Sequence, residues 1–241
     1  MAKQFDALVK SIFPGNCFEE LLIKFNVFHP TCSKMVLSRV LGLGITVGSI
    51  LLFVPQILKI AAAKSGKGIS LVSLILSLIG AIATSAYSYK KGFVFSQWGD
   101  SFFVTVQLVL IINQIYYYNG QIALIALFSG LVGAVTFGVV ADLIPMSVIV
   151  TLQALTVPIV VSSKGIQCWE NFSSKSTGQL SLISVFMQFA GTVARVFTSI
   201  QETGDQLLIG TFAIAAILNG FIFAQFFLYW NSAETTEKKK Q

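Results

Sequence analysis

Long stretches without any charged side chain alternate with short polar segments along this chain. Each stretch has about 18–25 residues, and at 1.5 Å per helical residue this length crosses a hydrocarbon layer of roughly 30 Å. A lipid layer offers no water to the backbone, so these segments must satisfy their own hydrogen bonds as helices. The pattern predicts an all-α membrane protein with seven transmembrane helices, at residues 40–58, 69–89, 101–118, 121–141, 143–163, 179–200 and 206–230.

The composition supports this class and excludes others. The chain is 55% hydrophobic and 11% charged, with a mean hydropathy of +0.80, which is too apolar for a soluble domain. Its net charge of +6 comes from basic segments flanking the spans, without the aromatic residues that accompany nucleic-acid contacts. No GxSxG, HExxH or Walker sequence occurs, and three cysteines with one histidine make no metal cluster. We therefore expect no enzyme activity, no catalytic residue, no cofactor, no metal and no nucleic-acid partner.

The first 38 residues differ from the rest because they are charged and lack a cleavable signal sequence. Apolar residues from Phe18 to Phe28 recur at helical spacing with charged residues between them, which predicts an amphipathic helix on the membrane surface. Cys17 and Cys32 bracket this segment. Two alternatives stay open for them: a disulfide, if the N-terminus is luminal, or two reduced thiols.

Five short features occur twice in the same order: Val-Pro, Ser-Leu-x-Ser, Gly, Gly-Asp and Asn. The shared order predicts a duplicated three-helix unit. Two such units in the same orientation need one extra crossing between them, and parallel repeats of this kind place a substrate cavity between the halves. The predicted organisation is an N-terminal segment 1–38, a first repeat 39–118, a linker helix 119–142, a second repeat 143–230 and a tail 231–241.

The sequence VPQ before a basic loop, followed by SLxS at the start of the next helix, resembles the PQ-loop family, which includes SWEET sugar transporters and cystinosin. LGLGITVGSILLFVPQILKI (41–60) and GTVARVFTSIQETGDQLLIGTF (191–212) are similar to the members that support use of mannose- and glucose-phosphate-dolichol in the endoplasmic reticulum. The resemblance implies a role with dolichol-linked sugar phosphates in glycan and GPI-anchor assembly, alongside glycosyltransferase partners. The alternatives are a SWEET-like carrier of a free small solute and a non-transporting adaptor.

Three residues are candidate hinge positions. Pro55 interrupts the first apolar stretch and is expected to kink that helix, because proline lacks a backbone donor. Gln56 offers a donor and acceptors to the backbone freed there. The second copy has Pro158 without the glutamine. The kink is either a fixed feature of the bundle or a hinge on which one half rocks.

Asn113 and Asn219 occupy matching depths on the third and seventh predicted helices. The family resemblance implies that they contact sugar in a cavity, and the alternative is hydrogen bonding between helices. Arg195 is the one charge within a predicted span. It either reaches the membrane surface with its long side chain or contacts a phosphate, which guanidinium binds through two hydrogen bonds.

Basic residues set the expected orientation, with a luminal N-terminus and a cytosolic C-terminus. Lys164 and Lys175 are assigned to a cytosolic loop, together with Cys168 as a free thiol and the sequon at Asn171, which should stay unmodified. Lys238 and Lys239, at the fourth and third positions from the end, resemble the dilysine signal that returns membrane proteins to the endoplasmic reticulum. The alternative is a basic stop after the last helix. The remaining basic residues of the count are Lys59, Lys64, Lys67 and Lys240 on the cytosolic side, against Lys90 and Lys91 on the luminal side.

Overall fold

The computed structural model describes residues 9, 12–66, 69–176 and 182–229, and regular structure in these residues is helical throughout. The chain divides into two compact units, Met1–Gln153 and Ala154–Gln241. Lys67 and the tail with Lys238 and Lys239 lie outside the described residues, as does the first serine of the second Ser-Leu-x-Ser motif.

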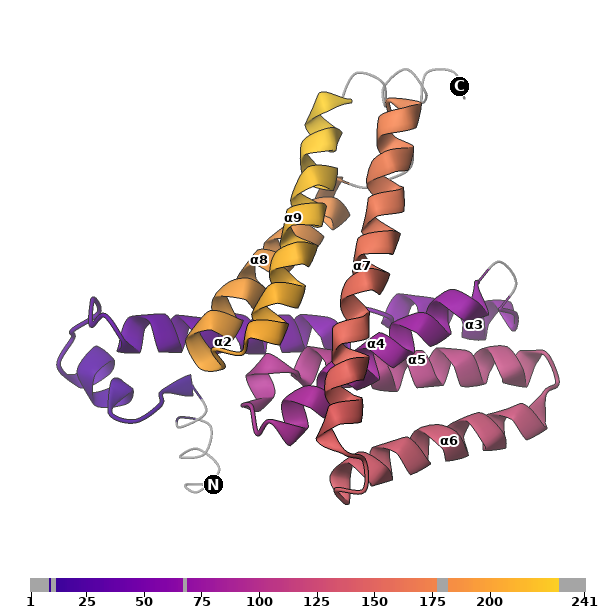
Figure 1. Ribbon diagram of the computed structural model, residues 1–241, viewed down its shortest axis with the longest axis horizontal. Helices are drawn as coiled ribbons and strands as arrows, with labels where there is room; N and C mark the ends of the chain where they lie inside the picture. Colours follow the sequence, from indigo (N-terminus) through magenta and orange to yellow (C-terminus); the bar gives the residue numbers. More distant parts are fainter. Residues whose placement is uncertain (1–8, 10–11, 67–68, 177–181, 230–241) are drawn as a thin grey trace. The chain divides into compact units, whose positions relative to one another are not determined.

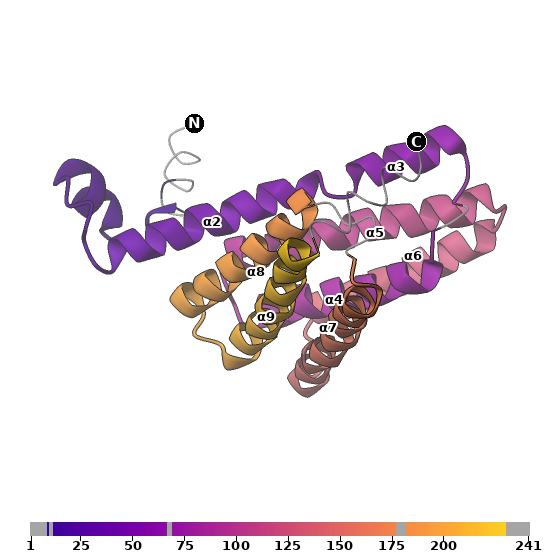
Figure 2. The same cartoon turned by 90° about the horizontal axis from the view of Figure 1, so that it is seen from above.

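The first unit is organised around one central helix, α5 (Gly99–Tyr118). It packs against all the other long helices of this unit, and Figures 1 and 2 show α6 running beside it after a short turn. Leu108, Ile111 and Ile112 of α5 are fully buried and form the centre of the apolar core. The other helices of the unit are α2 (Cys32–Ile50), α3 (Val54–Ala63), α4 (Leu71–Lys90) and α6 (Ile122–Val140), with two short turns, η1 (Glu19–Ile23) and η2 (Phe95–Gln97).

Local sequence signals define where the helices begin. Ser70 precedes α4, and its side chain accepts a hydrogen bond from the Ser73 backbone N–H at 3.3 Å, so the Ser-Leu-x-Ser motif is an N-terminal cap. Asp205 does the same for α9, accepting from the backbone N–H groups of Leu207 and Leu208 at 3.1 Å. The first Ser-Leu-x-Ser feature and both Gly-Asp features therefore lie at helix starts, although at α5 the N-cap residue is Trp98, whose side chain forms no capping hydrogen bond.

The second unit contains the end of α7 (Met146–Ser174), together with α8 (Leu182–Glu202) and α9 (Gln206–Leu228). Helices α8 and α9 form an antiparallel hairpin, visible in Figures 1 and 2. The rings of Phe189 and Phe223 stack between them with centroids 5.7 Å apart. The turn that joins them contains Gly204, whose φ of +59° suits a residue without a side chain.

Six helical segments in the described residues are long and apolar enough to cross a membrane: Cys32–Ala63, Leu71–Lys90, Gly99–Tyr118, Ile122–Val140, Met146–Ser174 and Gln206–Leu228. The prediction of an all-α, multi-pass membrane protein is confirmed. The sixth predicted span, 179–200, contains helix α8 (Leu182–Glu202), but α8 is not among these six segments. It carries polar residues at positions 188, 192, 195 and 199, a spacing that gives the helix one polar face.

The predicted amphipathic helix before the first span is wrong in its length. Only Glu19–Ile23 forms a continuous turn, Phe25 has a φ of +51°, and Phe28 is 94% exposed. The physical reason is a disulfide between Cys17 and Cys32, whose Cα atoms are 5.2 Å apart over a separation of 15 residues. A straight helix of that length would extend about 22 Å, so the chain must turn back.

The fifth span also ends later than predicted. Helix α7 continues to Ser174, so Lys164, Cys168 and Asn171 lie in a helix and not in a loop. The prediction ended this span at the first charged residue. The helix continues because its polar residues find hydrogen-bond partners on α8 and α9.

Candidate functional site: a latched helix break, polar pairs and an apolar groove

The first apolar stretch is broken in two at Pro55. Helix α2 ends at Ile50, helix α3 begins at Val54, and Pro55 lies in the first turn of α3. The N–H groups of a first helical turn have no partner within the helix, so proline costs nothing there. The predicted kink inside one continuous helix is therefore wrong, because the helix stops and starts again. The first regular bond of α3 runs from the Ile57 N–H to the Phe53 carbonyl at 2.9 Å.

Gln107 of α5 spans this break with both ends of its side-chain amide. Its Oε1 accepts from the Phe53 N–H at 2.8 Å, and its Nε2 donates to the carbonyls of Ser49 at 2.8 Å and Phe103 at 3.0 Å. Gln107 is buried, so these bonds are shielded from water. The amide ties α5 to the last turn of α2 and to the residue preceding α3, and we refer to it as the latch.

Gln56, which the sequence suggested for this role, is half-buried, and its side chain forms no hydrogen bond with any described residue. Its position next to Pro55 was the sole basis for expecting a hydrogen bond to the backbone there. Gln107 had a weaker signal, because an amide within an apolar helix indicates a functional or structural contact but does not identify its partner.

The second repeat lacks both the break and the latch. Helix α7 continues through Pro158. Aligning Asn113 with Asn219 places Ala213 where the first repeat has Gln107, and a methyl group can neither donate nor accept a hydrogen bond. The two prolines therefore lie in different local structures: Pro55 at a helix start and Pro158 inside a helix.

The two candidate asparagines each bond to a hydroxyl group of a neighbouring helix in their own unit. Asn113 Nδ2 donates to Ser129 Oγ of α6 at 3.0 Å, and Asn219 Nδ2 lies 3.5 Å from Thr192 Oγ1 of α8. The Oδ1 of Asn113 is buried without a hydrogen bond from any described residue. The structure thus contains the interhelical bonds, and Asn113 keeps one acceptor available.

Arg195 lies on the polar face of α8 and is only 4% exposed. This burial disfavours an arginine that reaches water at the membrane surface, where its side chain would be open. It is consistent with a guanidinium held for a contact inside the membrane.

A polar network connects α7 to both other helices of the second unit. Lys164 Nζ donates to Gln188 Oε1 of α8 at 2.5 Å. Asn171 Nδ2 donates to Gln225 Oε1 of α9 at 3.1 Å, and Gln225 Nε2 donates to the Cys168 carbonyl at 2.9 Å. Because Lys164 is the first charge after an apolar stretch, the sequence predicts a loop there and not a contact with α8. A helical spacing of apolar residues that continues through 164–174 is the pattern that could have indicated the longer helix.

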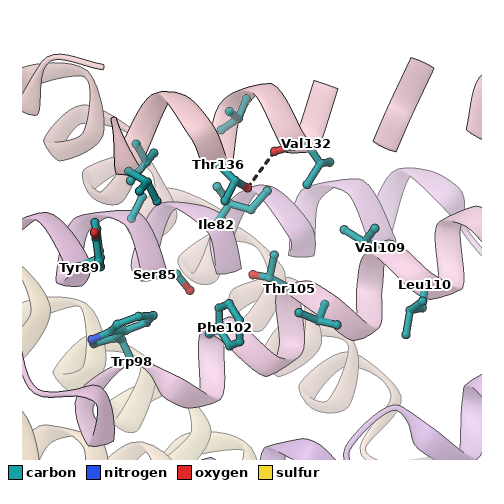
Figure 3. A pocket seen from close by; sticks show the side chains of 15 residues that line it. Ile82, Ser85, Tyr89, Trp98, Phe102, Thr105, Val109, Leu110, Val132 and Thr136 are labelled. Carbon is teal, nitrogen blue, oxygen red and sulfur yellow. Dashed lines mark hydrogen bonds between the residues drawn. The ribbon is translucent and has the colours of Figure 1, made fainter. Parts of the chain in front are cut away.

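The first unit contains an apolar groove of about 510 Å³ between α4, α5 and α6 (Figure 3). The hydroxyls of Thr105 and Thr136 in its wall donate to carbonyls of their own helices, Ser101 at 2.8 Å and Val132 at 2.9 Å. Few polar groups therefore remain for a sugar, and the groove suits a hydrocarbon chain. The lining residues are Ile82, Ser85, Ala86, Tyr89, Trp98, Phe102, Thr105, Val106, Val109, Leu110, Val132, Val135, Thr136, Val139 and Val140.

The groove follows α5 from Trp98 to Leu110, about 18 Å at 1.5 Å per residue. At the Trp98 end, Lys90 at the last residue of α4 forms an ion pair with Asp142, which follows α6. Beyond the Leu110 end, one turn further along α5, lies the Asn113–Ser129 pair. The groove therefore has an apolar length and polar residues near both ends.

The PQ loop repeat of known proteins matches this chain twice, over residues 37–97 and 150–208. The first match covers the helix break at Pro55, and the second covers Pro158 and all of α8. The chain thus carries two PQ-loop repeats, as the internal duplication predicted. Together with the apolar helices, these repeats define a multi-pass membrane protein of a class whose members are typically transporters or adaptors and not enzymes.

Proposed function

We propose that this protein handles dolichol-phosphate-linked mannose and glucose in the membrane of the endoplasmic reticulum, carrying or presenting them to the glycosyltransferases that build glycans and GPI anchors. The observation that carries the proposal is the apolar groove of the first unit, which a carrier of free sugar does not need. The segments 41–60 and 191–212 support the choice of lipid, since they resemble the mannose-phosphate-dolichol utilization defect 1 protein.

The shape of the groove favours a lipid chain over a free sugar. Its apolar wall follows α5 for about 18 Å, and an extended hydrocarbon chain can make contact along this whole length. The chain of a dolichol-linked sugar supplies such a segment.

Each unit also contains polar residues that are candidates for contacts with the phosphate or the sugar of such a ligand. Arg195, buried on the polar face of α8, is our candidate for the phosphate, and Asn113 and Asn219 are candidates for the sugar. The N-terminus is luminal and the C-terminus cytosolic in this proposal. The Cys17–Cys32 disulfide supports the luminal assignment, because disulfides persist in oxidising compartments.

The test uses the purified full-length protein in liposomes with a fluorescent short-chain mannose-phosphate-dolichol. We expect saturable binding of this lipid, with or without its movement between leaflets. The variant Val106→Trp fills the groove and should reduce binding at least tenfold. Leu127→Trp adds the same bulk at an exposed position of α6 outside the groove and should leave binding unchanged. Absence of lipid binding by the wild-type protein would overturn the proposal.

A second candidate function is a SWEET-like carrier of a free small solute, and the break at Pro55 is the observation that favours it, because a broken helix can serve as a hinge between two repeats. Uptake of mannose or glucose into the same liposomes, without lipid binding, would support this carrier. Finding neither activity would support the third alternative, a non-transporting adaptor for glycosyltransferases.

A further inference from the structure

The polar face of α8 continues onto both neighbouring helices of the second unit. Gln188 Oε1 accepts a hydrogen bond from the ammonium group of Lys164, which belongs to α7. One turn further along α8, Thr192 Oγ1 lies against Asn219 Nδ2 of α9. Arg195 lies a further turn along the same face. Lys164 lies four residues past the middle of α7, which is long and apolar enough to cross a membrane, so its backbone is roughly 6 Å from the middle of that helix.

Lys164 has no carboxylate beside it. Within the part of the chain that the structure describes, its side chain bonds to the neutral amide of Gln188 and forms no ion pair. Asp205, one of the acids of this unit, is used as the cap of α9. A charged lysine at such a depth is costly unless an anion or water meets it, and intramembrane charges of this kind mark binding sites.

The site is open to a ligand on one side. Lys164 is half-buried and Gln188 is exposed, whereas Arg195 is buried. Helical side chains lean toward the N-terminus of their helix, so Arg195 leans toward the turn that contains Gln188 and Thr192. Two cations therefore flank the Thr192–Asn219 pair, whose hydroxyl and amide groups suit a sugar.

We propose that Lys164 is an anion-binding residue of the second unit and receives the phosphate of the ligand, with Gln188 orienting its ammonium group. The identity of that ligand as a lipid-linked sugar phosphate rests on the proposed function. The phosphate lies between the Lys164 ammonium at the Gln188 level and the guanidinium of Arg195, which leans toward it, and the attached sugar lies against Thr192 and Asn219. Lysine supplies three donors and a full charge to a phosphate, and among the described residues of the second unit no carboxylate forms an ion pair with Lys164.

A purely structural role for Lys164 makes a different prediction, which Gln188→Glu tests. This substitution keeps the shape of the side chain and places a carboxylate 2.5 Å from the ammonium of Lys164. If Lys164 only ties α7 to α8, the new ion pair raises the melting temperature and leaves ligand binding unchanged. If Lys164 binds the phosphate, the carboxylate neutralises it, and affinity falls although the fold is stabilised.

The experiment measures binding to the full-length protein in nanodiscs of uncharged lipid, with three probes: short-chain mannose-phosphate-dolichol, the short-chain dolichol without phosphate, and inorganic phosphate. We expect Lys164→Gln and Gln188→Glu each to weaken binding of the phosphate lipid roughly 10- to 100-fold, the range for a charged hydrogen bond. Lys164→Arg should retain most of the affinity. Lys175→Gln, an equal loss of charge at the exposed end of α7, should bind as the wild type does.

The outcomes separate this inference from the proposed function. If both Lys164→Gln and Gln188→Glu bind the phosphate lipid as tightly as the wild type does, the proposed anion site is refuted and the proposed function stands. If the variants lose as much affinity for dolichol without phosphate as for the phosphate lipid, the proposed anion site is also refuted, because the effect then does not depend on the anion. Lys164-dependent binding of inorganic phosphate without lipid binding keeps the anion site and refutes the proposed function. No binding of either phosphate probe by the wild type refutes both.

Discussion

Replacing Gln107 by leucine removes the latch at the break between α2 and α3 while keeping the size of the side chain. Three hydrogen bonds are lost, but their consequences differ. The Ser49 carbonyl keeps a bond from the Leu52 N–H at 3.2 Å, and the Phe103 carbonyl lies inside helix α5. Among the described residues the Phe53 N–H has no other partner, so it alone is left unsatisfied, in a half-buried position.

An unsatisfied buried donor costs about 1–3 kcal/mol, and the lost interhelical bond to Ser49 adds about 0.6 kcal/mol, the average measured within membranes. We therefore expect Gln107→Leu to lower the free energy of unfolding by roughly 2–3 kcal/mol.

The assay is reversible unfolding of the purified protein in mixed micelles, followed by helical circular dichroism as the denaturing detergent is increased. Gln114→Leu is the matched control on the same helix, because its amide makes one long contact of 3.5 Å to the Ile57 carbonyl. It should cost less than about 1 kcal/mol. If the two leucine variants unfold within 0.5 kcal/mol of each other, a resolution typical of such measurements, the latch does not hold the break.

Four further predictions follow from individual residues. Pro55→Ala should change the free energy of unfolding by less than about 1 kcal/mol, because the residue lies in a first helical turn. If Pro55 is a hinge, the use of dolichol-linked sugar donors in cells (donor use) falls far more than the amount of the protein. An equal fall of both indicates a fixed structural role. Arg195→Lys should impair donor use, since lysine lacks the planar fork that binds phosphate, and full donor use by this variant refutes the phosphate contact. Asn171 should carry no glycan in cells, because its side chain is 6% exposed and bonded to Gln225; a glycosidase-sensitive mass shift would show otherwise. Replacing Lys238 and Lys239 with serine should release part of the protein to the Golgi or the cell surface, and a double variant that stays wholly reticular by microscopy would show that residence is set elsewhere.

The sequence by itself determined the class of the protein and the order of its parts. Charge-free stretches of membrane-crossing length appear as helices at or near their predicted positions, because an apolar segment in lipid has no alternative way to satisfy its backbone. The duplicated motifs likewise predicted the two PQ-loop repeats. Ser70 and Asp205 of these motifs are helix caps, whose hydrogen bonds join residues two or three positions apart, so their geometry is encoded locally.

Only the tertiary structure decided which polar residue meets which backbone group. Gln107 accepts a hydrogen bond from a backbone N–H at the helix break, 54 residues earlier in the chain, and Lys164 donates to a side chain 24 residues later. No periodic pattern in the sequence predicts either pairing. The same holds for helix ends. The first charged residue after an apolar stretch marks a boundary if it faces water or lipid head groups, but Lys164 and Asn171 stay in α7 because α8 and α9 supply partners for them. Whether a polar side chain ends a helix or extends it depends on what lies across from it, and that is fixed when the helices pack.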